Sequence, residues 1–311
     1  SLLGLNTENR AYKYIPDNTI FAKKLGIDPK EIKVLDPFAG AGSLMFPAAQ
    51  LGLDVTTSDY NPLAHIIERS ILEFPAKYET NIVVDFEKYA KLLIEKITED
   101  CGKFFTKNHL VYFWCWCITC PHCEQRVPLA NQMYIAKTPK KKIGIKIIPK
   151  NKDFTVKIIQ NISEAERKKY TQKGCKGICI SCKNSIDYKT ITKDIAKNKD
   201  REMIAIQIQN NKERKFTIPT IEDKKLYEHA TNYFKSKQEQ FQKEGWMPLE
   251  LIKPDNIKEN RLWKYGIKYW NEYFDDRQLL VMVSFLKNIK EICKSIEDEK
   301  YRSVIALYLT A

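Results

Sequence analysis

The chain has 311 residues and a formal net charge of +13, and its 43% hydrophobic and 29% charged residues exclude a fibrous or fully disordered protein. This length predicts two domains, or one large domain with an insertion. No apolar run is long enough to span a membrane, and the first residues lack a signal-peptide pattern. We therefore expect a cytoplasmic protein.

The positive charge is concentrated in one segment. Residues 137–219 contain 22 basic and 8 acidic residues, whereas the rest of the chain is close to neutral. This pattern is typical of a module that binds a polyanion, although a Lys-rich solvated face has the same composition. The candidate phosphate contacts are Lys140, Lys141, Lys142, Lys146, Arg167, Lys168 and Lys169.

The first part of the chain alternates between strand and helix patterns. Strands and helices are predicted in turn at 32–35, 44–51, 54–57 and 62–73. Pro75 is expected to lie beyond the end of the last of these helices, and a further amphipathic helix is predicted at 82–100. This order is typical of a doubly wound α/β fold.

Beyond residue 108 the pattern becomes β-rich and then helical. Strands are predicted at 109–118, 144–148, 154–159, 202–209 and 214–218, and helices at 222–243, 275–296 and 298–310. The chain is thus expected to have three parts. These are the first part of an α/β core (1–108), a basic β-rich insertion (109–219) and a helical segment that returns to the core (220–311).

A glycine-bearing turn, residues 36–42, follows the first predicted strand. Gly40 and Gly42 allow the backbone to approach a ligand at the start of a helix. Asp59 ends the next strand, where an acid can accept hydrogen bonds from both hydroxyls of a ribose. A nicotinamide site would need a third small residue after the glycines, and no Gly-Lys-Ser/Thr sequence is present for a nucleotide-phosphate loop.

Asp36–Ser43 and Ser58–Pro62 resemble motif I and the acidic motif of S-adenosylmethionine-dependent amino-group DNA methyltransferases. The resemblance implies that S-adenosylmethionine is the cofactor. It places the methionine part at Asp36 and the following turn, the ribose at Asp59 and the adenine beside Tyr60. The implied cofactor-binding residues are Asp36, Pro37, Phe38, Ala39, Gly40, Gly42, Asp59, Tyr60 and Asn61.

Two Cys-x-x-Cys pairs lie within the basic segment or just before it. Cys120, Cys123, Cys179 and Cys182 offer four thiolates, which suit one tetrahedral Zn²⁺. Cys117 lies close enough to the first pair to compete as a ligand, and buried unliganded thiols or a redox dithiol are the alternatives. Such a site would mainly stabilise a small module that lacks a core of its own.

The zinc pairs narrow the resemblance to a family assigned as adenine-specific DNA methylases with a zinc ribbon, marked by domain of unknown function 1156. Cys120–Leu129, Tyr265-Gly266 and Phe274–Leu280 carry it. The resemblance implies a Rossmann-like methyltransferase core, an inserted β-rich zinc-ribbon module and a helical C-terminal part. It also implies DNA as the partner and adenine N6 as the methylated atom.

The catalytic residues are unknown, because no Pro-Pro dipeptide of the Asp/Asn/Ser-Pro-Pro-Tyr type occurs in the chain. The resemblance implies that a missing C-terminal segment or a second polypeptide supplies this motif. The alternatives are an RNA methyltransferase and a non-catalytic zinc-ribbon protein that binds nucleic acid. Tyr112, Trp114 and Trp116 are expected to pack more often than to stack on bases, and the role of Arg277 stays open.

Overall fold

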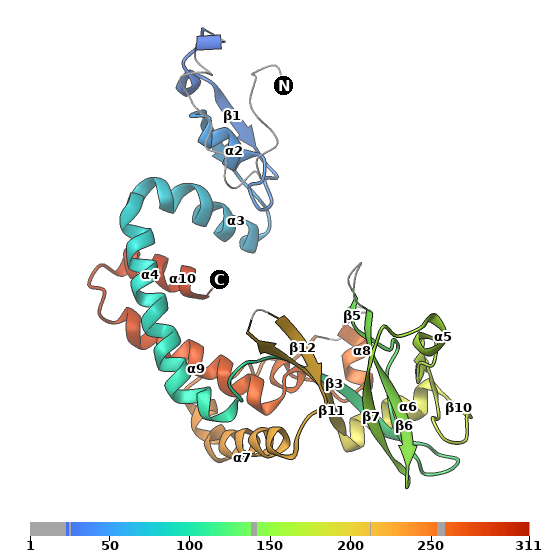
Figure 1. Ribbon diagram of the computed structural model, residues 1–311. Coiled ribbons are helices and arrows are strands. Elements are labelled where there is room, and N and C mark those ends of the chain that lie inside the picture. The colour runs from blue at the N-terminus through green and yellow to red at the C-terminus, as the bar shows by residue number, and fades with distance from the viewer. Residues whose placement is uncertain (1–22, 25, 138–141, 212, 254–258, 311) are drawn as a thin grey trace. The chain divides into compact units, whose positions relative to one another are not determined.

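The chain folds into two compact units that mix helices and strands (Figure 1). The computed structural model describes residues 23–310 except 25, 138–141, 212 and 254–258. Unit 1 comprises the described residues up to Glu95 together with those from Asn288 onward, and unit 2 comprises Lys96–Lys287. Helix makes up 47% and strand 24%, which excludes an all-α or all-β fold.

Unit 1 begins with a strand–helix–strand segment, as predicted. After the short 3-10 helix η2 (Pro29–Glu31), β1 (Lys33–Asp36) and β2 (Asp54–Thr57) pair in parallel. The short helix α2 (Met45–Gln50) connects them, as a parallel pair requires. Among the described residues these two strands form a sheet of their own, which is short of the predicted doubly wound sheet.

The helices that follow β2 do not end where the sequence predicts. α3 (Pro62–Glu68) continues through a π-helical turn, η3 (Arg69–Glu73), into α4 (Phe74–Cys101). The predicted end before Pro75 is therefore wrong. Pro75 directly follows the π-helical turn, in which the amide of Phe74 donates to the carbonyl of Arg69, and such a turn accommodates a local break in the regular hydrogen-bond ladder. The irregularity falls instead at Glu79, whose φ is 51°.

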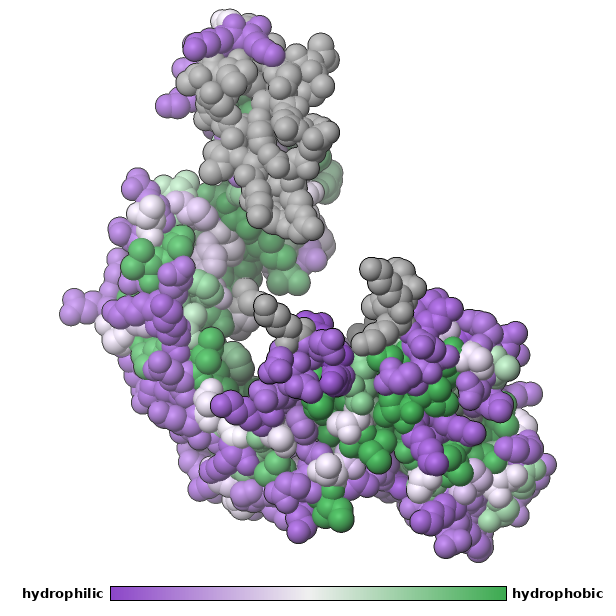
Figure 2. Space-filling model, viewed as in Figure 1, coloured by the Kyte–Doolittle hydropathy of each residue, from purple (hydrophilic) through white to green (hydrophobic). Residues whose placement is uncertain are grey.

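Unit 1 leaves much apolar surface exposed. Leu35 on β1 is 66% exposed and Leu63 on α3 is 63% exposed. Figure 2 shows hydrophobic side chains gathered over α3. Helix α10 (Glu299–Thr310) packs within this unit, where the hydroxyl of Tyr301 donates to Asp85 at 2.8 Å. Because parallel strands are normally covered on both faces, the described part of unit 1 presents a core face that is only partly covered.

Unit 2 contains the predicted β-rich module. Its main sheet has the order β12-β11-β3-β4 and is antiparallel throughout. A second sheet has the order β5-β6-β7, and a small one has the order β10-β9-β8. The strands are β3 (His109–Thr119), β4 (Arg126–Pro128), β5 (Tyr134–Lys137), β6 (Lys142–Lys150), β7 (Asp153–Gln160), β8 (Gln172–Lys173), β9 (Lys176–Ile178), β10 (Ser185–Ile186), β11 (Arg201–Asn210) and β12 (Glu213–Thr217).

Helices pack against these sheets and against one another, and the buried residues form separate hydrophobic clusters. The predicted helices after residue 220 are confirmed, because α7 and α9 lie close to their expected ranges. Ala230 and Phe234 of α7 pack against Leu279, Leu280 and Val283 of α9, and the two helices lie together in Figure 1. The helical segments from Gly102 to Cys293 are η4 (Gly102–Phe104), α5 (Glu164–Arg167), α6 (Tyr188–Asn198), α7 (Ile221–Lys243), α8 (Glu259–Lys264), η5 (Trp270–Tyr273) and α9 (Asp276–Cys293).

Candidate cofactor turn and metal centre

The carboxyl ends of β1 and β2 meet at one edge of the parallel pair. The amide of Ser58 donates to the carbonyl of Asp36 at 3.0 Å, and the amide of Ala39 donates to the carbonyl of Ser58 at 3.1 Å. These bonds continue the ladder past the strands into the glycine turn. In open α/β sheets this edge is where ligands bind.

Asp59 fixes this edge through both of its carboxylate oxygens. Oδ2 accepts a hydrogen bond from the amide of Gly40 at 2.8 Å, and Oδ1 accepts one from the amide of Asn61 at 2.7 Å. The bonds from Asn61 and Gly40 hold the pKa of Asp59 below its usual range. The carboxylate is therefore ionised at neutral pH, and each oxygen keeps a second lone pair for a ligand hydroxyl.

Glycine is favoured at positions 40 and 42 for partly different structural reasons. Gly40 has a φ of 56°, and a Cβ built on it would meet no atom within 4 Å. Gly42 has a φ of 69°, and its Cβ would lie 2.9 Å from Cδ1 of Ile71. Both positions favour glycine for the backbone conformation, but only Gly40 faces open space where a ligand can approach.

The other predicted cofactor residues lie at the same edge. Phe38 and Tyr60 are 81% and 98% exposed, so their rings have almost no protein packing. The side chain of Asn61 accepts from the amide of Leu63 at 3.0 Å and so caps the N-terminus of α3. The structure thus brings the sequence-predicted set together, comprising Asp36, Pro37, Phe38, Ala39, Gly40, Gly42, Asp59, Tyr60 and Asn61.

The two Cys-x-x-Cys pairs form matching knuckles in unit 2. In each knuckle the first cysteine amide donates to a carbonyl five residues on, from Cys120 to Gln125 at 2.8 Å and from Cys179 to Asn184 at 3.0 Å. The residue after each second cysteine, Glu124 or Lys183, has a positive φ. This repeated backbone turns both thiols of a knuckle to the same side.

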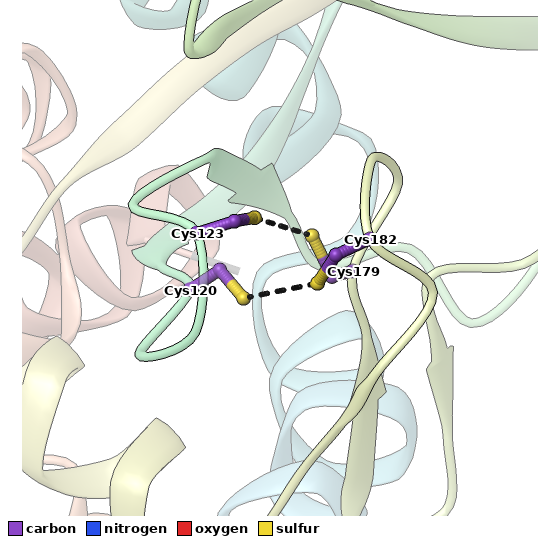
Figure 3. A group of neighbouring side chains, drawn as sticks. All are labelled: Cys120, Cys123, Cys179 and Cys182. Atoms are coloured by element: carbon purple, nitrogen blue, oxygen red, sulfur yellow. Dashed lines mark hydrogen bonds between the residues drawn. The ribbon is translucent and has the colours of Figure 1, made fainter.

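The four thiols converge on one point (Figure 3). The sulfurs of Cys120, Cys123, Cys179 and Cys182 all lie within 4.8 Å of one another. The Cys120–Cys182 distance is 3.8 Å and the Cys123–Cys179 distance is 3.6 Å. Sulfurs at about 2.3 Å from a tetrahedral Zn²⁺ are about 3.8 Å apart, so the residues fit this metal.

The remaining cysteines of this region do not join the cluster. Cys117 is fully buried on β3, with Sγ 4.0 Å from the carbonyl oxygen of Cys115. Burial raises the pKa of Cys115 to about 12 and raises that of Cys117 as well, so both stay protonated. Cys175 is exposed. The competing ligand set with Cys117 is therefore wrong, because its thiol points into the strand layer.

The metal site is part of a hydrophobic core. Cys120 and Cys179 are buried with Ile118, Val127 and Ile186, and Trp116 and Tyr265 pack against this cluster. Helix α6, which the sequence analysis missed, adds Ile191 and Ile195. A metal bound here would therefore hold together β3, the β9–β10 hairpin and α6, segments that are far apart in the sequence.

The candidate phosphate contacts are only partly visible. Lys140 and Lys141 lie outside the described residues. Lys142 and Lys146 are exposed on β6, and Lys168 and Lys169 are exposed after α5. Arg167 differs from these cations, because Nη2 lies 2.6 Å from the Glu164 carboxylate, which neutralises its charge locally.

Strand pairing adds a cation that the sequence analysis missed. Lys157 on β7 lies directly opposite Lys146, and both side chains are exposed. Like charges placed opposite each other destabilise a sheet, so this pair is a cost that a bound polyanion would offset. The alternating pattern of β7 was the available signal, because it places Lys157 on the outer face.

Comparison of the chain with protein-family models, with curated proteins and with solved structures finds no match in any of the three. The methylase resemblance therefore depends on the quoted motifs and on the geometry described above. None of the described helices combines the length and the hydropathy that crossing a bilayer requires.

Proposed function

We propose that this chain is the cofactor-binding and zinc-ribbon part of an S-adenosylmethionine-dependent DNA methyltransferase that acts on adenine N6. The observation that carries the proposal is the joined edge of β1 and β2, where Asp59 bonds the amide of Gly40 at 2.8 Å. The acid and the glycine turn, which are separate in sequence, are joined there by a direct hydrogen bond. Methyl transfer needs a Pro-Pro motif that these 311 residues do not supply.

The residues at this edge suit the parts of S-adenosylmethionine. Asp59 would accept the ribose hydroxyls, and the exposed ring of Tyr60 would lie against the adenine. Asp36 and the turn through Gly42 would hold the methionine part, with Gly40 leaving space for it. The bound cofactor would supply an electrophilic methyl group for an amine of the nucleic acid.

Cofactor binding is the first test. Asp59→Ala is expected to weaken S-adenosylmethionine binding about 100-fold in calorimetric titration, because two hydrogen bonds to a charged group contribute about 3 kcal/mol. Tyr60→Ala is expected to weaken binding about tenfold through lost stacking. Because Tyr60 is 98% exposed, its substitution cannot act through packing.

Asp54→Ala is the matched control for Asp59→Ala. Asp54 is an exposed acid at the other end of the same strand. The Asp54→Ala substitution is expected to leave the dissociation constant for S-adenosylmethionine unchanged. Absence of binding by the wild-type chain, or equal binding by the wild type, Asp59→Ala and Tyr60→Ala, would contradict the cofactor assignment.

Nucleic-acid binding by the second sheet is a separate prediction. The double substitution Lys146→Gln with Lys157→Gln is expected to reduce the salt dependence of duplex DNA binding by about two counterions, measured as the slope of log affinity against log salt. The slope should change without loss of folding, because the two like charges face each other. Lys152→Gln with Lys150→Gln is the control, because Lys152 pairs with Glu124 and Lys150 lies opposite Asp153. An unchanged slope in the Lys146–Lys157 variant would remove this pair from the interface.

The second candidate is a methyltransferase of structured RNA, which the same cofactor edge would serve. Competition between duplex DNA and a hairpin RNA of equal length distinguishes the two. Preferential displacement by RNA would replace the DNA assignment. Salt-dependent nucleic-acid binding without any cofactor binding would instead favour a non-catalytic zinc-ribbon protein.

A further inference from the structure

Two adjoining cavities lie within unit 2. One has a volume of about 530 Å³ and the other about 380 Å³. Both are in the size range of small-molecule sites. They share five lining residues, which define the feature called here the Trp116 groove: Trp116, Arg201, Tyr265, Ile267 and Asp275.

A stacked cation forms one wall of the Trp116 groove. Arg201 and Trp116 are paired across β11 and β3, and the guanidinium carbon lies 3.9 Å from the centre of the indole ring. Among the described residues, the Arg201 guanidinium has no carboxylate or carbonyl partner. Its sequence neighbours Asp200 and Glu202 bond Arg126 instead, at 2.7 and 3.0 Å.

This arrangement favours a planar ligand with acceptor atoms. A guanidinium stacked on an aromatic ring presents a flat surface on which a further ring can stack. Its N–H groups project at the edge of that plane, where acceptor oxygens that flank the stacked ring, such as those of a sugar or phosphate, can accept. Because the described residues leave the Arg201 N–H groups to solvent, a ligand can accept from them without displacing an intramolecular partner.

An unpaired acceptor lies in the same groove. Asn271 lines the smaller cavity, and its buried Oδ1 has no hydrogen-bond partner within the part of the chain that the structure describes. The amide of Asn271 donates to the carbonyl of Pro248 at 2.8 Å, which fixes the backbone at that point. A ligand N–H group would satisfy Oδ1. Aromatic side chains of Tyr227, Tyr265 and Phe274 line the cavity around it.

The Arg201 guanidinium and Oδ1 of Asn271, which both lack a hydrogen-bond partner among the described residues, define the class of ligand. A simple anion would satisfy Arg201 but would leave Asn271 unpaired and would meet Asp275 and Asp276. An apolar ligand would satisfy neither group. A planar ring with an N–H donor can stack on the face of Arg201 and donate to Asn271, and nucleobases with an exocyclic amino group have this composition.

We propose that the Trp116 groove binds an unpaired nucleobase, stacked on Arg201 and Trp116 with its amino group at Asn271. The inference depends on the proposed nucleic-acid binding and adds a base subsite to it. The groove shares no residue with the cofactor turn. The base comes either from a single strand or from a free nucleotide, because both present the same ring.

The test uses 2-aminopurine, a fluorescent base with ring acceptors and an amino group. A short single-stranded oligonucleotide with one central 2-aminopurine is titrated, and quenching reports stacking while the anisotropy of an end label reports binding of the strand. Arg201→Lys is expected to weaken quenching about tenfold, because it keeps the charge but loses the planar stack. Anisotropy binding should stay within about twofold, because the phosphate contacts remain.

Asn271→Leu is the second variant, and it should weaken quenching without changing the net charge. Arg214→Lys on β12 is the matched control, because Arg214 is exposed and lines neither cavity. Free 2-aminopurine deoxynucleoside monophosphate identifies the source of the base. Quenching of the free nucleotide indicates a nucleotide site, and quenching of the oligonucleotide alone indicates a strand site; both support the groove.

The outcomes separate the groove from the broader function. Anisotropy binding without quenching in the wild type would overturn the base subsite and leave nucleic-acid binding intact. Quenching that Arg201→Lys and Asn271→Leu leave unchanged would also overturn it. If the wild type shows no anisotropy binding and quenches neither probe, both the base subsite and the nucleic-acid function are overturned.

Discussion

Removal of zinc is expected to unfold the core of unit 2. Cys179→Ser should lower the bound zinc from about one ion per chain to none and abolish the cooperative thermal transition of this unit. The physical reason is that a structural zinc site contributes roughly 10 kcal/mol, which exceeds the stability of a typical domain. Elemental analysis and circular dichroism with and without a chelator measure the two effects.

Cys175→Ser is the control for this experiment. Cys175 is exposed and stands four residues before Cys179, but its sulfur does not belong to the cluster. It should keep the full zinc content and an unchanged melting temperature. A Cys179→Ser protein that retains zinc, or a zinc-free protein that melts like the wild type, would show that the cluster does not stabilise unit 2 through a metal.

The metal centre shows which information is local in the sequence. Each knuckle consists of one Cys-x-x-Cys pair whose turn is fixed by its own backbone bonds, as at Cys120 and Gln125. One tetrahedral ion needs two such pairs, so the grouping of these four thiols was predictable despite the long gap between pairs. The choice against Cys117 needed the structure, because only the direction of the β3 strand turns its thiol away.

The strands and helices were also predictable, because their apolar patterns are local in the sequence. The irregularities within the helices were not predictable in this way. Apolar patterning predicts β1, β2 and α9 near their observed ranges. The break at Glu79 was missed, because Pro75 looked like a stop, whereas the chain passes it through the π-helical turn η3.

The Trp116 groove was not predictable from the chain. Trp116 and Arg201 are far apart in the sequence and meet only through the register of β3 and β11. The unpaired state of Asn271 Oδ1 depends on side chains from other segments, which no local pattern shows. Sequence reasoning gave Trp116 a packing role, which its contact with the core around the four cysteines confirms, and the strand register also makes it one wall of a cavity.

Arg277, whose role the sequence left open, is expected to stabilise unit 2. Its side chain is 5% exposed, and its guanidinium carbon lies 4.7 Å from the ring centre of Phe105, 4.1 Å from that of Tyr112 and 5.2 Å from that of Tyr227. These rings come from three different segments, so the guanidinium joins the start of α9 to β3 and α7. Burial raises the pKa of Tyr227 to about 12, which keeps this ring a neutral phenol.

Arg277→Ala is expected to lower the free energy of unfolding by about 3 kcal/mol, because it leaves a cavity between three aromatic rings. Arg277→Lys should cost about 2 kcal/mol, since an ammonium is more strongly hydrated and lacks the planar surface. Urea unfolding followed by circular dichroism measures both, and Arg261→Ala on the exposed face of α8 should stay within about 0.5 kcal/mol of the wild type.

The same variants separate a structural role of Arg277 from a role in cofactor binding. If Arg277 acts through the aromatic cage, S-adenosylmethionine affinity should be unchanged in Arg277→Lys under conditions in which the protein is folded. Wild-type stability in Arg277→Ala together with weaker cofactor binding would contradict the cage assignment. The contacts favour the structural result. Among the described residues Arg277 contacts three rings and the carbonyl of Phe104, all within unit 2, whereas the cofactor turn belongs to unit 1.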